Sequence, residues 1–202
     1  MPANHSVHFF DQQFQCQVII GDLALNPFEE LALPYLRGRV LDFGCGMGNL
    51  AVAAAKRGCS VVALDASAAA ISYLQRRATE ELLAVEASQV DLRYTDITES
   101  FDTIVSIGLL AFFDRPTALR RLANLQARVR EGGIAVVNVL IEGTTYMDMF
   151  DAEGYCLFSP AEIKLQFAGW TILHSGLSDF DAPDQKIKSF VTLIAQKPII
   201  VT

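Results

Sequence analysis

The sequence predicts a doubly wound α/β fold: a seven-stranded, mostly parallel sheet with helices on both faces and the last strand antiparallel. From residue 39 onward, short apolar segments alternate with helical ones. Continuous apolar strands of this kind are typical of parallel sheets that are buried on both faces. The final β-like segments, 171–175 and 189–196, leave no room for a helix between them. That spacing favours an antiparallel pair at the edge of the sheet.

The elements divide the chain into two parts that form one globular unit. Residues 1–38 are expected to be a helical lid or cap segment, and residues 39–202 form the main domain. Helices in the main domain begin at capping residues or end at a glycine. We expect strands at 39–43, 60–64, 92–95, 103–107, 134–140, 171–175 and 189–196, and helices at 8–35, 47–57, 67–86, 114–129 and just after Ser159-Pro160.

Composition excludes several classes of function. The chain has 202 residues, of which 51% are hydrophobic, enough to fill a core, and its net charge of -7 argues against nucleic acid or a membrane surface as partner. The four cysteines are widely spaced, which is typical of free thiols and not of disulfides or a metal site. There is neither a signal-peptide pattern nor an apolar run of membrane-spanning length. We expect a cytoplasmic monomer or homodimer.

A glycine-rich loop is the sharpest functional signal. In VLDFGCGMGN, residues 40–49, an apolar strand runs into Gly44, Cys45, Gly46 and Gly48, and a helix follows at once. Glycine permits a tight turn and lets a ligand approach the backbone, while the helix N-terminus offers free N–H groups. A dinucleotide-binding loop would have its third glycine where Asn49 stands. The spacing therefore favours another nucleotide-like ligand.

Two aspartates follow the first two strands. Asp42 would attract the ammonium group of a ligand and repel a pyrophosphate, or it holds the glycine loop through backbone hydrogen bonds. Asp65, beside Ala66, lies about twenty residues beyond the loop, where a carboxylate can accept hydrogen bonds from both ribose hydroxyls. The alternative role for Asp65 is that of a helix cap.

Further contacts with the ligand are expected where the third and fourth strands end. Asp96 and Ile97 follow the expected third strand and would meet an adenine ring; the alternative is a solvated turn. Ser106 and Leu109 follow the fourth strand, at the crevice where open α/β sheets bind ligands.

The loop, the second strand with its aspartate (61–65) and the turn at Gly132-Gly133 together resemble the class I S-adenosylmethionine (SAM)-dependent methyltransferase family. The resemblance covers nearly the whole chain after Arg39. It implies a Rossmann-like fold, SAM as the cofactor and, because the chain is short, a small-molecule acceptor.

A second resemblance points to tellurite-resistance methyltransferases, on residues 158–163, 169–170 and 190–197. It implies a soft oxyanion such as tellurite, or a thiol, as the acceptor. Those enzymes carry a His-Arg pair before the last strand, whereas the matching stretch here reads Asp179-Phe180-Asp181. Lys186 and Lys188 are the only cations nearby.

The acceptor site is expected between the N-terminal segment and the insertion at 142–158. Mobile aromatic loops often form lids, although aromatic residues here would equally serve to cover the sheet edge. The candidate substrate contacts are Phe10, Phe112, Tyr146, Met149 and Tyr155. The residues identify no general base, so no catalytic residue is assigned. Two alternatives stay open: a nicotinamide-dependent oxidoreductase, and a non-catalytic SAM-binding sensor or partner subunit.

Overall fold

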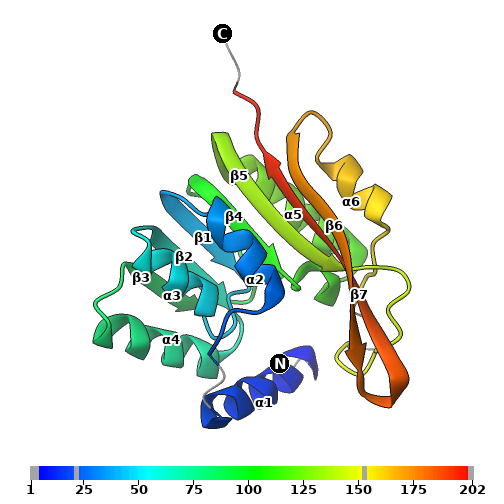
Figure 1. Cartoon of the computed structure of the whole chain (residues 1–202), viewed down its shortest axis with the longest axis horizontal. Helices are drawn as coiled ribbons and strands as arrows, with labels where there is room; N and C mark the ends of the chain where they lie inside the picture. Colours follow the sequence, from blue (N-terminus) through cyan, green and yellow to red (C-terminus); the bar gives the residue numbers. More distant parts are fainter. Residues whose placement is uncertain (1–4, 21–22, 152–153, 200–202) are drawn as a thin grey trace.

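Seven strands form one twisted sheet in a computed structural model that describes residues 5–20, 23–151 and 154–199 (Figure 1). The strands are ordered β3-β2-β1-β4-β5-β7-β6. The first five are parallel, and β7 is antiparallel to both of its neighbours. The predicted fold class is therefore confirmed. The strands are β1 (Arg39–Phe43), β2 (Ser60–Asp65), β3 (Val85–Gln89), β4 (Phe101–Ile107), β5 (Val129–Leu140), β6 (Thr171–Ala182) and β7 (Lys186–Gln196).

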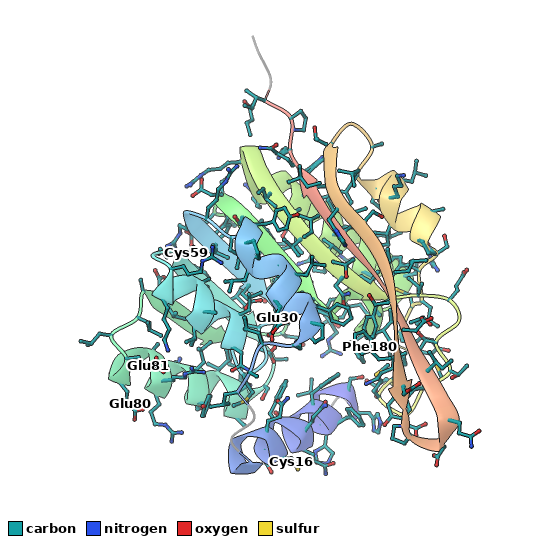
Figure 2. The ribbon with its side chains drawn as sticks, viewed as in Figure 1. Cys16, Glu30, Cys59, Glu80, Glu81 and Phe180 are labelled. Atoms are coloured by element: carbon teal, nitrogen blue, oxygen red, sulfur yellow. The ribbon has the colours of Figure 1, made fainter. Side chains whose placement is uncertain are left out.

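Helices cover both faces of the sheet. They are α1 (His5–Ile20), α2 (Pro27–Ala32), α3 (Asn49–Lys56), α4 (Ala68–Glu80), α5 (Arg115–Arg128) and α6 (Pro160–Gln166), with 3-10 turns η1 (Leu33–Tyr35), η2 (Leu110–Phe112) and η3 (Pro183–Gln185). Successive strand residues face opposite sides, so Val40 packs with α3 and α4, while Leu41 packs with α5 and α6. Side chains fill both layers (Figure 2).

Side-chain caps fix where α2, α4, α5 and α6 begin. Ser67 accepts a hydrogen bond from Ala70 N at 3.0 Å, Asp114 caps α5, and Ser159 caps α6. At α2, Asn26 accepts from Glu29 N at 3.0 Å, and the Glu29 carboxylate accepts from Asn26 N at 2.8 Å. This reciprocal capping box holds the short α2 in place over the sheet.

The third strand lies earlier in the chain than the sequence predicts. The segment 92–95 is a turn, and the strand is β3, so α4 ends at Glu80 instead of Glu86. The physical reason is that β3 is an edge strand, hydrogen-bonded only to β2. Three of its five residues, Glu86, Ser88 and Gln89, are exposed and polar, so it lacks the continuous apolar run of a central strand.

Other element boundaries also differ from those expected. The N-terminal helical region is broken near Asn26-Pro27 into α1, α2 and η1. The final hairpin is longer than predicted, since β6 continues to Ala182 and β7 begins at Lys186. Within the described ranges, no helix is both long and apolar enough to span a membrane.

Candidate active site

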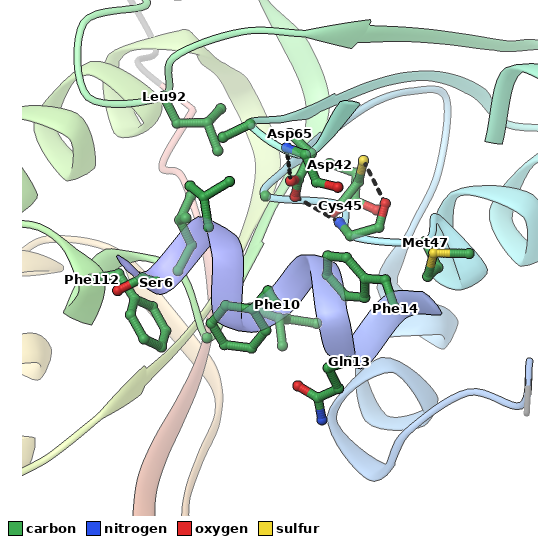
Figure 3. Close-up of a pocket in the computed structure, with 18 of the residues that line it drawn as sticks. Ser6, Phe10, Gln13, Phe14, Asp42, Cys45, Met47, Asp65, Leu92 and Phe112 are labelled. Atoms are coloured by element: carbon green, nitrogen blue, oxygen red, sulfur yellow. Dashed lines mark hydrogen bonds between the residues drawn. The ribbon is translucent and has the colours of Figure 1, made fainter. Parts of the chain in front are cut away.

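A cavity of about 720 Å³ opens at the carboxyl ends of the parallel strands, between the sheet edge and α1 (Figure 3). Phe10 and Phe14 of α1 line one side of it, opposite the glycine loop and Asp65. This is the place where open α/β sheets bind ligands, because the loops that leave the strands diverge there. The volume is in the range of ordinary small-molecule sites.

The glycine loop follows β1 and is held from β2. Gly44 N and Cys45 N donate hydrogen bonds to Leu64 O at 2.8 and 3.1 Å. Gly46 N donates to Asp65 Oδ2 at 2.8 Å, while Asp65 Oδ1 accepts from Ser67 N at 2.9 Å. The aspartate that holds the loop by a backbone hydrogen bond is thus Asp65, which leaves the Asp42 carboxylate free to face the cavity.

All three loop glycines have positive φ, and two of them, Gly46 and Gly48, serve different purposes. A Cβ on Gly46 would lie 3.1 Å from the Phe14 ring, so this glycine lets the backbone face the cavity closely. A Cβ on Gly48 would lie 2.5 Å from Leu74 of α4. Gly48 does not line the cavity; it permits close packing of α3 against α4.

Buried carboxyl groups dominate the electrostatics near the loop. Asp42 is 5% exposed, and burial, together with the nearby Glu29 and Asp65, raises its pKa to about 8. Burial also raises the pKa of Glu29 and of Asp65, although backbone hydrogen bonds partly offset the rise at Asp65. Burial raises the pKa of the Cys45 thiol well above its usual value, so this thiol stays protonated. A cationic ligand group would favour the ionised form of these carboxyl groups and so lower their pKa values.

The cavity brings together most of the predicted contacts. The residues that line it as expected are Asp42, Gly44, Cys45, Gly46, Asp65, Ala66 and Leu109 from the cofactor set, and Phe10, Phe112 and Met149 from the substrate set. Six others lie outside its lining: Gly48, Asp96, Ile97, Ser106, Tyr146 and Tyr155.

Asp96 and Ile97 are displaced because the third strand ends earlier than predicted. The Asp96 side chain is 70% exposed and pairs with Arg121 at 2.7 Å, and Ile97 is buried in the core. Asp91 and Leu92, which follow β3, line the cavity instead. Arg121 itself is buried under this turn.

The remaining three residues point elsewhere. Ser106 is fully buried, on the same face of β4 as the core residue Ile104. Tyr155 stacks on Phe150 with ring centroids 4.8 Å apart. The ring of Tyr146 faces the ammonium group of Lys188 at 5.7 Å.

Sequence reasoning missed several lining residues that come from distant segments. These are Phe14 of α1, Phe28 and Glu29 of α2, Asp91 and Leu92 after β3, Asn138 of β5, and Lys188 and Phe190 of β7. The capping-box pattern of Asn26 and Glu29 locates α2 in the sequence. Nothing local in the sequence shows that α2 packs over the carboxyl ends of the strands.

The carboxylate of Asp42 provides a test of whether the site fits SAM. It is buried, it lines the cavity, and no described residue donates a hydrogen bond to it. An ammonium group placed there would supply the missing donor and the compensating charge. The residues present therefore fit a ligand that carries an ammonium group close to a nucleoside.

Comparison with known sequences agrees with this geometry. Residues 40–133 match a family model described as a methyltransferase domain. Probable S-adenosyl-L-methionine-dependent methyltransferase TehB of Haemophilus influenzae (strain 10810) is 24% identical over 196 residues, covering 94% of this chain and 66% of TehB. Hemagglutinin 1 of Eikenella corrodens is 29% identical over 170 residues, covering 79% of this chain and 55% of the hemagglutinin. The chain thus spans between about half and two thirds of the length of these relatives.

Solved structures share the fold. The crystal structure of TehB from Haemophilus influenzae superposes with a TM-score of 0.74 and 21% identity, covering 86% of this chain and 63% of that one. N-methyltransferase NodS from Bradyrhizobium japonicum, in complex with S-adenosyl-L-homocysteine, superposes with a TM-score of 0.69 and 18% identity. The match covers 94% of this chain and 99% of NodS. At these identities the likeness concerns the fold.

Proposed function

We propose that the chain is a class I SAM-dependent methyltransferase that methylates a small molecule, supported by the match of residues 40–133 to a methyltransferase domain and by the likeness to TehB. SAM, when bound, supplies a methyl group on a positively charged sulfur. The observation that carries the proposal is the shared cavity, in which the glycine loop, Asp42 and Asp65 meet the aromatic residues Phe10 and Phe112.

The roles proposed for the cofactor end follow from these contacts. Asp42 faces the ammonium group of the methionine part. Asp65 accepts from the ribose hydroxyls, because each carboxylate oxygen can accept a further hydrogen bond besides those from Gly46 N and Ser67 N. Asp91 and Leu92 meet the adenine end.

For the acceptor, the residues of this chain orient the molecule and exclude water. We propose that α1 and the insertion at 142–158 form a lid, since His5 N donates to Asp151 at 3.1 Å and Ser6 Oγ to Met149 O at 2.9 Å. An anionic nucleophile in line with the methyl group needs no base. For a neutral acceptor, Glu29 lines the cavity, and its raised pKa makes its carboxylate a proton acceptor close to Asp42.

A soft oxyanion such as tellurite, or a thiol, is the second candidate acceptor, supported by the likeness to TehB. Against it, the stretch that matches the His-Arg pair lies on β6 and supplies Asp179 and Asp181 instead.

The proposal is tested by titrating the purified protein with S-adenosylhomocysteine and, separately, with NADH in a calorimeter. We expect the first to bind and the second not to bind. Asp65→Ala should weaken binding of S-adenosylhomocysteine by about 1–3 kcal/mol, because ribose hydroxyls lose their acceptor.

The outcomes separate the alternatives. Binding of NADH alone would establish the oxidoreductase, and binding of neither ligand would remove the methyltransferase proposal. Binding of S-adenosylhomocysteine by a protein that methylates none of a broad acceptor panel would favour the sensor. Unchanged affinity in a folded Asp65→Ala protein would remove the ribose assignment.

A further inference from the structure

The cavity has a second end, formed by β5, β7 and the segments that cover them. We call it the acceptor end; it comprises Phe28, Asn138, Leu140, Met149, Lys188 and Phe190. Its walls are mostly apolar. Phe28 and Phe190 lie with ring centroids 4.8 Å apart, and Phe28 also contacts Phe180 of the hairpin, with ring centroids 5.1 Å apart. Such walls favour a flat apolar body over a small hydrated ion.

Asn138 places an unpaired polar group in these walls. The residue is fully buried on the face of the sheet that also carries Asp42 and Ile107. Its Nδ2 donates to Thr192 Oγ1 at 2.8 Å across the β5–β7 pair, and its Oδ1 accepts no hydrogen bond from any described residue. Turning the amide around exchanges the two atoms but still leaves one of them unpaired. A buried polar atom left in this way costs free energy, which a ligand group can recover.

Lys188 places a positive charge beyond Asn138. It precedes Thr192 by four residues on the same strand face, which corresponds to about 13 Å between α-carbons along β7. Its ammonium group lies 5.7 Å from the centre of the Tyr146 ring. Among the described side chains, no carboxylate forms an ion pair with it.

The charges of the cavity are therefore separated along its length. Asp42 and Asp65 lie at the glycine loop, near the end of β1 and at the end of β2, with Glu29 close to Asp42 and Asp11 close to Asp65. Arg93, the other lining residue with a permanent positive charge, is neutralised by Asp91 at 2.7 Å. Among the described lining residues, Lys188 is left as the unneutralised cation, at the opposite end from Asp42 and Asp65.

From this arrangement we infer that the acceptor is a ring-bearing organic acid. Its apolar body lies between Phe28, Phe112 and Phe190, a hydroxyl or amine bonds to Asn138, and its anionic group pairs with Lys188. The inference rests on the proposed function, and it names the class of acceptor. Tellurite, which is anionic but lacks an apolar body, would use only part of this site.

The test compares acids with neutral molecules of the same shape. The probes are 4-hydroxybenzoate, 4-hydroxyphenylacetate and 3-(4-hydroxyphenyl)propanoate, each with its carboxamide, titrated into the full chain saturated with S-adenosylhomocysteine. The three lengths cover the span between Asn138 and Lys188. We expect at least one acid to bind roughly tenfold more tightly than its amide, the usual range for one partly buried ion pair.

Two variants assign the preference to its residues. Lys188→Met should abolish the preference for acid over amide. Lys186→Met is the matched control, because Lys186 contacts the same Tyr146 ring but pairs with Asp148 at 3.1 Å and does not line the cavity. Asn138→Leu should abolish the preference for the hydroxylated acid over the acid that lacks the hydroxyl.

Several results would overturn the inference. They are equal binding of acids and amides, no binding of any probe, and a preference that survives Lys188→Met. Tellurite binding that depends on Lys188, with no binding of the ring acids, would replace the ring-bearing acid with a bare oxyanion. Each titration begins with S-adenosylhomocysteine, so failure of that first step would reject the proposed function instead.

Discussion

At the scale of single residues, the charge of the cavity depends on Asp42. The pKa of this buried carboxyl is raised to about 8, so the folded protein keeps a proton that the unfolded chain releases from about pH 4 upward. The folded state thus binds more protons than the unfolded state across this interval. The contribution of Asp42 to the free energy of unfolding therefore falls as pH rises, by up to about 1.4 kcal/mol per pH unit.

Asp42→Asn should remove that slope, because the amide does not ionise. Urea unfolding at pH 5, 6, 7 and 8 measures it. We expect the variant to gain stability relative to the wild type as pH rises, because the loss of stability caused by Asp42 occurs in the wild type alone. The Glu29 and Asp65 carboxyls are present in both proteins. Parallel pH profiles for the two proteins would show that Asp42 is already ionised in the folded protein.

A second prediction at this scale concerns the glycines. Gly48 and Gly58 have φ of +73° and +91°, so a side chain strains the backbone at both positions. Only at Gly48 would the new Cβ meet Leu74, at 2.5 Å, whereas at Gly58 nothing lies within 4 Å. Gly48→Ala should therefore destabilise the protein by about 1–3 kcal/mol more than Gly58→Ala in urea unfolding. Equal losses would show that α4 moves away at little cost.

At the scale of elements, α1 is attached to the rest of the molecule by a few hydrogen bonds and by ring contacts such as that of Phe10 with Phe112. The Ser67 hydroxyl donates to Asp11 of α1 and also accepts from Ala70 N as the cap of α4. Asp11→Ala removes the hydrogen bond between α1 and Ser67, so it should raise the dissociation rate of S-adenosylhomocysteine several-fold. It should change the free energy of unfolding by less than about 0.5 kcal/mol. Ser67→Ala should lower stability as well, by about 1 kcal/mol, because α4 loses its cap. Stopped-flow displacement measures the rate; an unchanged rate in Asp11→Ala would show that α1 does not gate the cavity.

The elements also show how far sequence reasoning reaches. Central strands such as β1 and β4 are recognisable from their apolar runs, and Ser67, Asp114 and Ser159 mark helix starts, because these signals are local. The edge strand β3 is half polar, so its predicted position was wrong, and Asp96, the residue expected beside an adenine ring, lies outside the cavity that Asp91 lines.

The acceptor end could not have been predicted in the same way. Asn138 and Lys188 are fifty residues apart in sequence, and they line one cavity only because β7 is inserted beside β5. Tyr146 and Tyr155 were assigned to the substrate from their residue type, but the direction in which an irregular segment turns its side chains is set by tertiary packing.

At the scale of the whole molecule, the cavity joins segments from almost the entire chain, from α1 to β7. A ligand bound there stabilises the folded state as one unit. At a concentration one hundred times its Kd, S-adenosylhomocysteine should add about 2.7 kcal/mol, which corresponds to a rise in Tm of about 5–10 °C for a domain of this size. NADH should give no shift in the same scan, and two separate transitions would show that the α1 region unfolds independently.

The position of β7 has a consequence for synthesis of the chain. This strand lies between β5 and β6, yet it follows both of them in sequence. While the ribosome is still translating residues 171–185, the backbone groups along one side of β5 have no partner strand. A nascent chain at this stage presents an open apolar edge to other chains. The sheet closes only when residues 186–196 have left the exit tunnel, so any pause in translation shortly before that point prolongs the interval in which aggregation competes with folding.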